Sequence, residues 1–453
     1  MEVIISERGR NLLVLHGYKF RFHKTLANNT ERWMCTKNTC KSFLKRGKNE
    51  EVLAGPSPHS HEPLEENKLE RQKLSNGLKR KASDDICARP SKLIHLALKN
   101  NDIETLTRND ISLIKRNMLN ARQSKHVNPR STEETLSAVG NMDIKTNANE
   151  DFVIVNDLQS KILGFSTKKN LEALCRSDTV YVDGTFKSCP KYFYQLFTFH
   201  ALHYDSYVPL AFFLLPNKTV KCYENCFRHL VNTCLNVGLR FSPKNIFIDF
   251  EKAIHVSVQS VLTETKIKGC RFHLGQSWYR KIQSIGLARV YASKSEKANF
   301  LKSFFGLAFL RPEDVSTVFT DYIMAELPDD QTVTEFCDYV LENYISEDAP
   351  FPPQIWAEFS CSANRTTNSC ESFHARLNRM FNSPHPNISI FIEVLKGIQS
   401  ETYIHLRSKS TKKSKTIIEK EIFLREAIAD LCNCHISLFE FVKKVSFKFL
   451  PIF

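Results

Sequence analysis

Hydrophobic positions group into regular apolar runs in the middle of the chain. Three runs follow one another within residues 178–216, DTVYVDGTF, YQLFTFHALH and VPLAFFLLP, and short polar turns separate them. Residues 223–239 then show a helical pattern, NIFIDF at 245–250 is a fourth apolar run, and residues 251–264 are helical again. Three consecutive strands, a helix, a further strand and a helix predict a mixed sheet covered by helices.

The same pattern divides the whole chain into four parts. Residues 1–62 alternate short strand-like pieces with polar turns, which predicts a small β-rich module with too little apolar content to fold unaided. Residues 63–149 are mainly charged and polar and predict a basic, partly helical linker. The α/β pattern covers 150–405 with a helical insertion at about 286–355, and a charged, helical tail covers 406–453.

Composition adds a preference for a polyanionic partner. The chain has 63 Lys and Arg against 49 Asp and Glu, a formal net charge of +14, which favours nucleic acid over an anionic membrane surface. An apolar run of about 18 residues and a signal-peptide pattern are both absent from the sequence, so we expect a soluble intracellular protein. Because the cytosol and nucleus keep thiols reduced, the 14 Cys indicate buried thiols or metal ligands rather than disulfides.

Four residues of the first module have the spacing of a zinc site. Cys35 and Cys40 form a C-x4-C pair, and His59 and His61 follow in SPHSHE. Zn²⁺ prefers four soft or borderline ligands in a tetrahedron, and a module with a thin core gains most from a structural ion. The alternative is that these residues occur together in a loop by chance.

The sequence around these four residues resembles the FLYWCH-type zinc finger. SERGRNLLVLHGYKFRF, ERWMCTKNTCKSFLKRG and HSHEP contain an arginine–glycine pair, an aromatic GY-x-F strand, W-x-C before the second cysteine and a closing H-x-H. The resemblance covers nearly the whole module. It implies a zinc-stabilised β module that binds DNA or protein.

Two carboxylates stand at the ends of predicted strands. Asp183 ends the first apolar run and Asp249 ends the fourth, and the two would converge if their strands are neighbours in one sheet. Convergent carboxylates repel one another, so they stay ionised mainly when a cation lies between them. Two Mg²⁺ ions held there would activate a water or a 3′-hydroxyl for phosphodiester displacement. The alternative is a turn role for each acid, or a helix N-cap in the case of Asp249.

The surroundings of both acids resemble known families. The order of three strands, a helix and a strand resembles the ribonuclease H-like fold, where an acid on the first strand pairs with an acid on the fourth. D-G-T-F at Asp183, D-x-E-x-A at Asp249 and a later C-x2-H resemble the transposase domain of Mutator-like elements (MULE), over roughly residues 150–400. This resemblance implies a triad of catalytic acids, two aspartates and a glutamate, that binds Mg²⁺ or Mn²⁺.

The third acid is expected after the helical insertion. TTNSCESFHARLN resembles the family's T-x-N-x-x-E-S-x-N/H helix, which makes Glu371 the candidate catalytic acid and metal ligand. Asn368 followed by Glu371 also fits a capping box, a pattern that occurs at any helix start. Glu358 in WAEFS and Glu393 in FIEVL are competitors for the same role.

Cys270 and His273 form the C-x2-H pair in GCRFHLGQ. Two ligands are half a zinc site, and a buried cysteine beside a helix-capping histidine is the alternative. The family resemblance implies that the pair is local structure or contacts the active site, so we expect a structural pair rather than a metal site.

These features together predict a DNA transposase of the Mutator-like class. It would cut and transfer DNA strands with two Mg²⁺ or Mn²⁺ ions, while a zinc finger binds double-stranded DNA, expected to be the element's terminal repeats. We also expect a nuclear location, and LKRK at 78–81 is either a nuclear localisation signal or solvated surface. We expect no membrane partner, and a homo-oligomer is possible. The alternatives are a domesticated DNA-binding or transcription-regulatory protein without catalytic activity, and a zinc-dependent protein-interaction module on an inert scaffold.

Overall fold

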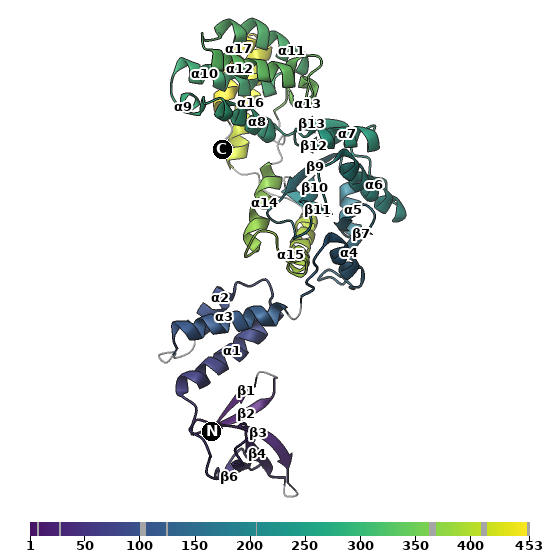
Figure 1. Ribbon diagram of the computed structural model, residues 1–453. Coiled ribbons are helices and arrows are strands. Elements are labelled where there is room, and N and C mark those ends of the chain that lie inside the picture. Colours follow the sequence, from purple (N-terminus) through teal and green to yellow (C-terminus); the bar gives the residue numbers. More distant parts are fainter. Residues whose placement is uncertain are drawn as a thin grey trace. The chain divides into compact units, whose positions relative to one another are not determined.

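The computed structural model of the protein contains two compact units. It describes residues 1–6, 9–26, 29–99, 106–123, 126–204, 206–361, 368–408 and 415–450. Unit 1 is Met1–Asn128 and unit 2 is Pro129–Phe453, and Figure 1 shows their helices and strands in order. A β-rich start followed by mixed helices and strands confirms the predicted α/β class.

Unit 1 begins with a six-stranded antiparallel sheet whose strands pair in sequential order. The strands are β1 (Glu2–Ile5), β2 (Asn11–Leu15), β3 (Tyr18–Thr25), β4 (Glu31–Cys35), β5 (Phe43–Arg46) and β6 (Val52–Ala54). His16 and Gly17 both have positive φ and form the tight turn between β2 and β3. One side of the sheet buries a small core of Leu13, Phe20, Trp33 and Leu44.

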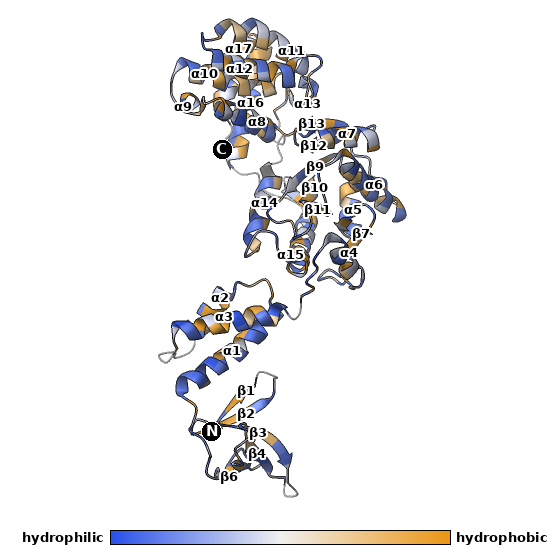
Figure 2. Cartoon of the chain, viewed as in Figure 1, coloured by the Kyte–Doolittle hydropathy of each residue, from blue (hydrophilic) through white to orange (hydrophobic). Residues whose placement is uncertain are grey.

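Three helices complete unit 1: α1 (Glu66–Asp84), α2 (Pro90–Lys99) and α3 (Arg108–Gln123). Figure 2 shows α1 as largely hydrophilic, whereas α2 carries several hydrophobic residues. The three helices bury a small shared core of Leu78, Ala82, Ile94, Ile114 and Met118. The buried guanidinium of Arg122 donates to the carbonyl oxygens of Ala82 and Asp85, each at 2.8 Å, and so ties α3 to the end of α1.

Unit 2 is built on a seven-stranded mixed sheet in the order β13-β12-β9-β10-β11-β8-β7. The strands are β7 (Val153–Asp157), β8 (Ile162–Phe165), β9 (Thr179–Thr185), β10 (Gln195–His203), β11 (Ser206–Leu215), β12 (Asn245–Ile248) and β13 (Lys266–Gly269). β9, β10 and β11 form an antiparallel meander, and β12 pairs parallel to β9. The meander strands are buried on both faces, which explains their continuous apolar runs.

Helices cover both faces of this sheet (Figure 1). The helices beside the sheet are α4 (Thr132–Gly140), α5 (Lys168–Cys175), α6 (Val220–Asn236), α7 (Lys252–Val261), α14 (Asn368–Met380) and α15 (Ile388–Arg407). α6 begins where the Thr219 side chain accepts a hydrogen bond from the amide of Cys222. α6 and α7 share a core with one face of β9, and Cys370 of α14 packs against Tyr181 and Phe247 on the other face.

A second core of unit 2 is entirely helical. Its elements are α8 (Arg271–Ser284), α9 (Ala288–Tyr291), α10 (Glu296–Ser303), η1 (Phe304–Phe309), α11 (Pro312–Thr317), η2 (Val318–Ile323), η3 (Met324–Glu326), α12 (Gln331–Val340), η4 (Leu341–Ile345), α13 (Pro353–Trp356), α16 (Lys415–Cys432) and α17 (Leu438–Lys448). Phe441 and Val445 of α17 are fully buried in this core. The C-terminal helices therefore complete the core that α8 to α13 begin, as the yellow and green ribbons of Figure 1 show.

None of the helices in the described parts of the chain is long and apolar enough to cross a membrane.

Candidate functional site

The four predicted zinc ligands lie together in unit 1. Cys35 ends β4, Cys40 lies in the following turn, and His59 and His61 lie after β6. Their ligand atoms are all within 4.8 Å of one another, with Cys35 Sγ 3.2 Å from His61 Nε2 and Cys40 Sγ 3.4 Å from His59 Nδ1. A tetrahedron with Zn bonds of about 2.0–2.3 Å places its ligands roughly 3.3–3.8 Å apart. The spacing therefore fits a Cys2His2 zinc site.

Hydrogen bonds determine which nitrogen of each histidine faces the cysteines. Ser42 Oγ donates to the carbonyl oxygen of Ser57 at 2.5 Å, so it accepts from His59 Nε2 at 3.1 Å. His59 Nδ1 is then the unprotonated nitrogen. His61 Nδ1 donates to the carbonyl oxygen of Glu62 at 2.8 Å, which leaves Nε2 unprotonated. Both metal-facing nitrogens thus have a lone pair available, as a zinc site requires.

Two further contacts favour metal binding at this cluster. Burial raises the pKa of Cys40, but backbone hydrogen bonds from Ser60 and Ser42 outweigh it and lower the pKa to about 7. The thiolate, which is the form that binds zinc, is therefore accessible at neutral pH. The ring of Tyr18 stacks on His59 with a centroid distance of 3.7 Å, and this contact holds the imidazole plane.

Asp183 and Asp249 lie side by side at the carboxyl ends of β9 and β12. The parallel register pairs Asn245 with Thr179 and continues for two more residues, an offset of 66 positions. Asp249 and Asp183 differ by the same offset (249 − 183 = 66), so the continued register sets them opposite each other. Asp183 is 7% exposed, whereas the Asp249 side chain is 46% exposed.

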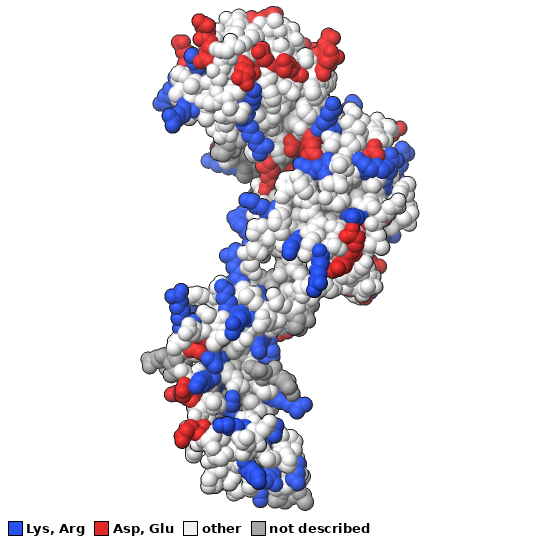
Figure 3. Space-filling model, in the orientation of Figure 1, with Lys and Arg blue, Asp and Glu red and all other residues white. Residues whose placement is uncertain are grey.

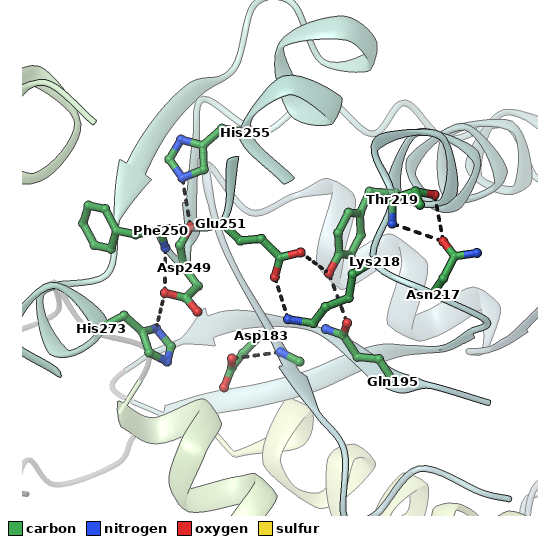
Figure 4. A network of polar contacts seen from close by, with 12 residues as sticks. Asp183, Gln195, Asn217, Lys218, Thr219, Asp249, Phe250, Glu251, His255 and His273 are labelled. Carbon is green, nitrogen blue, oxygen red and sulfur yellow. Dashed lines mark hydrogen bonds and ion pairs between the residues drawn. The ribbon is translucent and has the colours of Figure 1, made fainter. Parts of the chain in front are cut away.

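Each aspartate accepts a hydrogen bond from the amide that follows it. Gly184 N donates to Asp183 Oδ1 at 2.8 Å, and Phe250 N donates to Asp249 Oδ1 at 2.6 Å (Figure 4). α7 has Glu251 as its N-cap residue, and Asp249 stands before it. In this structure Asp249 therefore directly follows β12 and is not the N-cap residue of α7.

His273 links the second acid to the third. It lies in the first turn of α8, with Nδ1 3.7 Å from Asp249 Oδ1 and Nε2 2.9 Å from Glu371 Oε1. Burial lowers the pKa of His273, but hydrogen bonds to Cys270 and Glu371 and the charge of Asp249 outweigh it and raise the pKa to about 12. The imidazolium holds the two carboxylates together, and the hydrogen bond to Cys270 joins the C-x2-H pair.

The chemistry of this donor set suits a hard divalent cation. Three carboxylates offer the oxygen ligands that Mg²⁺ and Mn²⁺ prefer. Their spacing is wider than that of the zinc cluster: among the described residues, only the Cys2His2 set has three or more ligand atoms within 4.8 Å of one another. The His273 ring contacts Glu371 and lies 3.7 Å from Asp249, so this imidazole stands beside both of these acids.

The competitors of Glu371 make different contacts. Glu358 accepts from Ser360 Oγ at 2.8 Å and lies 4.0 Å from Lys268 Nζ, and Glu393 pairs with a lysine one turn along α15 at 2.7 Å. Glu371 contacts His273, which itself contacts Asp249. The capping-box alternative depends on the side chain of Asn368, which lies outside the described residues.

A row of buried polar side chains is linked to Asp183 through His374. His374 Nδ1 lies 3.1 Å from Asp183 Oδ2, and both side chains are 7% exposed. Thr198 Oγ1 lies 2.9 Å from His374 Nε2 and 2.9 Å from His200 Nε2. Burial raises the pKa of Asp183, but the hydrogen bond and charge of His374 outweigh it, so the pKa falls below its usual value. His374 thus keeps the buried carboxylate ionised and fixes its orientation.

A second network lies beside the two aspartates on the other side of the sheet (Figure 4). Lys218 Nζ contacts Glu251 Oε2 at 2.7 Å, and the hydroxyl of Tyr223 lies 3.1 Å from Glu251 Oε1 and 3.0 Å from Gln195 Oε1. A Cβ on Gly184 would lie 1.7 Å from Gln195 Nε2. Glycine at this position lets Gln195 approach the strand end.

Sequence reasoning singled out neither network. His374 stands three residues after Glu371, at the N/H position of the helix motif. The motif therefore includes this histidine, but it does not show that Asp183 is its partner. Glu251 is likewise the acid of the D-x-E-x-A motif. Their partners Thr198 and Lys218 occupy other elements, and only the folded chain brings them together.

Two family models match parts of this chain. Residues 179–277 match the MULE transposase domain. Residues 3–61 match the FLYWCH zinc finger domain. The MULE match includes Asp183, Asp249 and His273, and the FLYWCH match includes all four zinc ligands. A comparison with curated proteins finds no match. The two matches indicate a transposase-related DNA-binding protein.

Removing the zinc ligands should unfold the finger without unfolding unit 2. The sheet of unit 1 has a small apolar core, and structural zinc contributes about 10–16 kcal/mol in such modules. We expect Cys40→Ser to lower the zinc content, measured by mass spectrometry, and to expose the FLYWCH region to limited proteolysis. Cys87→Ser, at a half-buried cysteine outside the cluster, is the matched control. A finger that stays protected without zinc would contradict this assignment.

Removing the buried His374 should destabilise unit 2 far more than removing a partly exposed histidine. His374→Ala leaves the buried carboxylate of Asp183 without its partner, a loss of about 3–5 kcal/mol. His229→Ala breaks a similar contact with the half-exposed Asp157, at 3.2 Å, and should cost about 1 kcal/mol or less.

Thermal unfolding compares the two variants with the parent chain. Adding Asp183→Asn to His374→Ala should restore part of the loss, because a neutral amide needs no ionic partner. Equal losses for both histidine variants would contradict the supporting role of His374.

Proposed function

We propose that this protein is a Mutator-like DNA transposase with a ribonuclease H-like catalytic region at 150–405 and a DNA-binding zinc finger at 1–62. Asp183, Asp249 and Glu371 would hold two divalent cations, Mg²⁺ or Mn²⁺. The observation that carries the proposal is the parallel register of β9 and β12, which sets the two aspartates opposite each other inside the segment that matches the MULE transposase domain.

The proposed reaction is transfer at a DNA phosphodiester. Bound cations would supply Lewis acidity, which activates the attacking oxygen and stabilises the leaving one. Water attacks phosphorus, the bond between phosphorus and the 3′-oxygen breaks, and a 3′-hydroxyl and a 5′-phosphate result. The 3′-hydroxyl then attacks phosphorus of a second phosphodiester, and the bond from that phosphorus to its own 3′-oxygen breaks and leaves a new 3′-hydroxyl. This step therefore forms one phosphodiester and breaks one. No covalent intermediate with the protein is needed.

The exposed fraction of each acid suggests a different role for it in the proposed reaction. Asp183 is buried and fixed by His374, so it would provide a rigid anchor for the reacting groups. Asp249 is half-exposed and faces solvent, so it would stand on the side where the DNA strand enters. Glu371 and His273 come from α14 and α8, and their 2.9 Å contact links the helical part of unit 2 to the sheet.

Charge distribution supports DNA binding by unit 1. Residues 1–128 contain 25 Lys and Arg and 14 Asp and Glu, so this unit carries +11 of the chain's net +14. On the face drawn in Figure 3, basic side chains predominate over unit 1, whereas acidic ones gather at the outer end of the helical core of unit 2. Positive charge concentrated on one unit favours phosphate contacts through counterion release.

A groove on the finger offers a specific place for these contacts. It has a volume of about 1280 Å³, and its lining includes Arg10, Arg21, Phe22 and Trp33. Arg10 and Arg21 are exposed, and Phe22 is 49% exposed beside them. Basic side chains interleaved with aromatic rings are typical of nucleic-acid surfaces. Terminal repeats of the element as the target, a homo-oligomeric state and a nuclear location are further parts of the proposal.

One observation favours the alternative of a non-catalytic, domesticated DNA-binding protein. The His273 imidazolium lies 2.9 Å from Glu371 and 3.7 Å from Asp249, so its single positive charge offsets part of their negative charge. In that case the acids would serve the stability of unit 2, and DNA binding by the finger would be the whole function.

Replacing Asp183 separates the two functions. We expect Asp183→Asn to reduce Mg²⁺-dependent nicking of a supercoiled plasmid that carries the DNA flanking the gene by roughly 100-fold or more, the scale of losing one transition-state stabiliser. Asp178→Asn, at the opposite end of the same strand and paired with Lys244 at 2.8 Å, is the control and should leave nicking unchanged. Nicking that is absent from the parent chain, or equal in all three proteins, would refute the enzyme proposal.

A further inference from the structure

Three aromatic side chains lie exposed in the loop between β9 and β10. Phe186 is 41% exposed, Tyr192 is 36% exposed and Tyr194 is 52% exposed. The rings of Phe186 and Tyr194 contact each other edge to face, with centroids 5.5 Å apart. This contact covers part of one ring, and the remaining exposed area of the two rings forms a joint apolar surface. Adjacent exposed aromatic side chains are unfavourable in a free protein and mark sites of contact with a ligand.

The loop that carries these rings is itself well anchored. Ser188, Cys189 and Phe193 are buried, and the carbonyl oxygen of Lys187 accepts from His385 N at 2.9 Å. The carbonyl oxygen of Tyr192 accepts from Thr132 Oγ1 at 2.5 Å. The aromatic side chains are thus held outside by a fixed backbone, and their exposure is a property of the fold.

Backbone strain at Tyr192 also indicates that this loop contacts a ligand. Its φ is +76°, in the left-handed region that bulky residues avoid. Such a conformation costs of the order of 1–3 kcal/mol and persists at functional sites, where the surrounding structure enforces it. Here the strained residue is one of the three exposed rings.

Lysines surround the exposed rings. Lys191 Nζ lies 5.1 Å from the ring centroid of Tyr192, and Lys218 Nζ lies 5.0 Å from that of Phe186. Lys187 is exposed and lies between Phe186 and Tyr192 in the sequence. Positive charges beside aromatic faces match a ligand that has both phosphates and planar rings.

The loop lies next to the acid cluster. Phe186 follows Asp183 by three residues, which at about 3.4 Å per residue along a strand places the two Cα atoms roughly 10 Å apart. Lys218, whose ammonium lies over Phe186, also contacts Glu251, and Figure 4 shows this pair beside Asp183 and Asp249. The loop therefore begins at the end of the sheet that carries the acids, and a DNA strand that crosses this end would meet both.

We propose that the loop at 186–194 is a stacking platform for unpaired bases of the DNA strand beside the catalytic acids. Bases would stack on Phe186 and Tyr194, while Lys187 and Lys191 contact the backbone phosphates. Paired bases expose only their edges to a protein, so faces of aromatic rings are suited to unpaired ones. The inference rests on the proposed function, because it assumes that DNA enters the site of Asp183.

Binding of matched oligonucleotides to the full-length, zinc-loaded chain tests the platform. Fluorescence anisotropy compares a blunt duplex with the same duplex extended by a short single-stranded tail at either end. The finger contributes equally to both, so the ratio of the two affinities reports on the tail alone. We expect the tailed duplex to bind about 5- to 150-fold more tightly for each base that stacks.

Two variants of the loop, one control variant and one altered probe identify stacking as the cause. Phe186→Ala with Tyr194→Ala should abolish the preference for the tail and leave the affinity for the blunt duplex unchanged. Phe186→Trp should retain the preference. A tail of abasic nucleotides keeps the phosphates but lacks the bases, so it should bind like the blunt duplex. Tyr322→Ala, at a 39% exposed ring of the helical core, is the matched control and should have no effect.

The outcomes separate this inference from the proposed function. A tail preference that survives with abasic nucleotides, or in the double variant, would overturn stacking. A double variant with a changed oligomeric state in sedimentation and no change in DNA binding would show that the rings contact a second copy of the chain instead. Loss of nicking with an intact tail preference would overturn catalysis alone, and absence of all DNA binding would overturn both.

Discussion

The parallel pairing of β12 with β9 is the constraint on which the candidate catalytic site depends. Neighbouring parallel strands end at the same edge of a sheet. Asp183 and Asp249 differ by the same 66 positions as the paired residues of β9 and β12, so this pairing makes them neighbours. The crossover through α6 returns the chain parallel to β9 after the antiparallel meander. A slip by one residue would turn Asp249 to the opposite face and separate the acids.

The helical parts of unit 2 determine what surrounds the two aspartates. α14 brings His374 against Asp183 and Glu371 toward the sheet edge, and α8 brings His273 between the outer acids. The buried aspartate has His374 as its own partner, whereas Asp249 and Glu371 share His273. This difference in burial supports the proposed role of Asp183 as the anchor of the site.

Local sequence patterns were sufficient for the parts of the fold that depend on neighbouring residues. The apolar runs around Asp183 and Asp249 predicted their strands, and the Cys and His spacing predicted the cluster that the structure brings together. The packing of α17 into the helical core depends on contacts between distant segments, and periodicity does not encode them. For the same reason Thr198 and His374, 176 residues apart, could not be paired from sequence.

Residues 63–149 show a related limit. Their low apolar content indicates a linker, yet α1, α2 and α3 share a small core because Arg122 satisfies the carbonyl groups at the end of α1. A few buried side chains are enough to hold these helices together, because the Arg122 side chain provides hydrogen bonds to carbonyl groups at the end of α1. The exposed rings beside Asp183 were also invisible in the sequence, since an aromatic letter does not tell whether its side chain is buried.

The most direct test of the account is the affinity of the acid cluster for Mn²⁺, measured by electron paramagnetic resonance on the zinc-loaded chain. We expect the parent protein to bind Mn²⁺, and Asp249→Asn and Glu371→Gln each to weaken this binding roughly 10-fold or more, while Glu393→Gln leaves it unchanged. Mn²⁺ binding that is absent from the parent chain, or the same in all four proteins, would contradict the central claim that these three acids form a metal site.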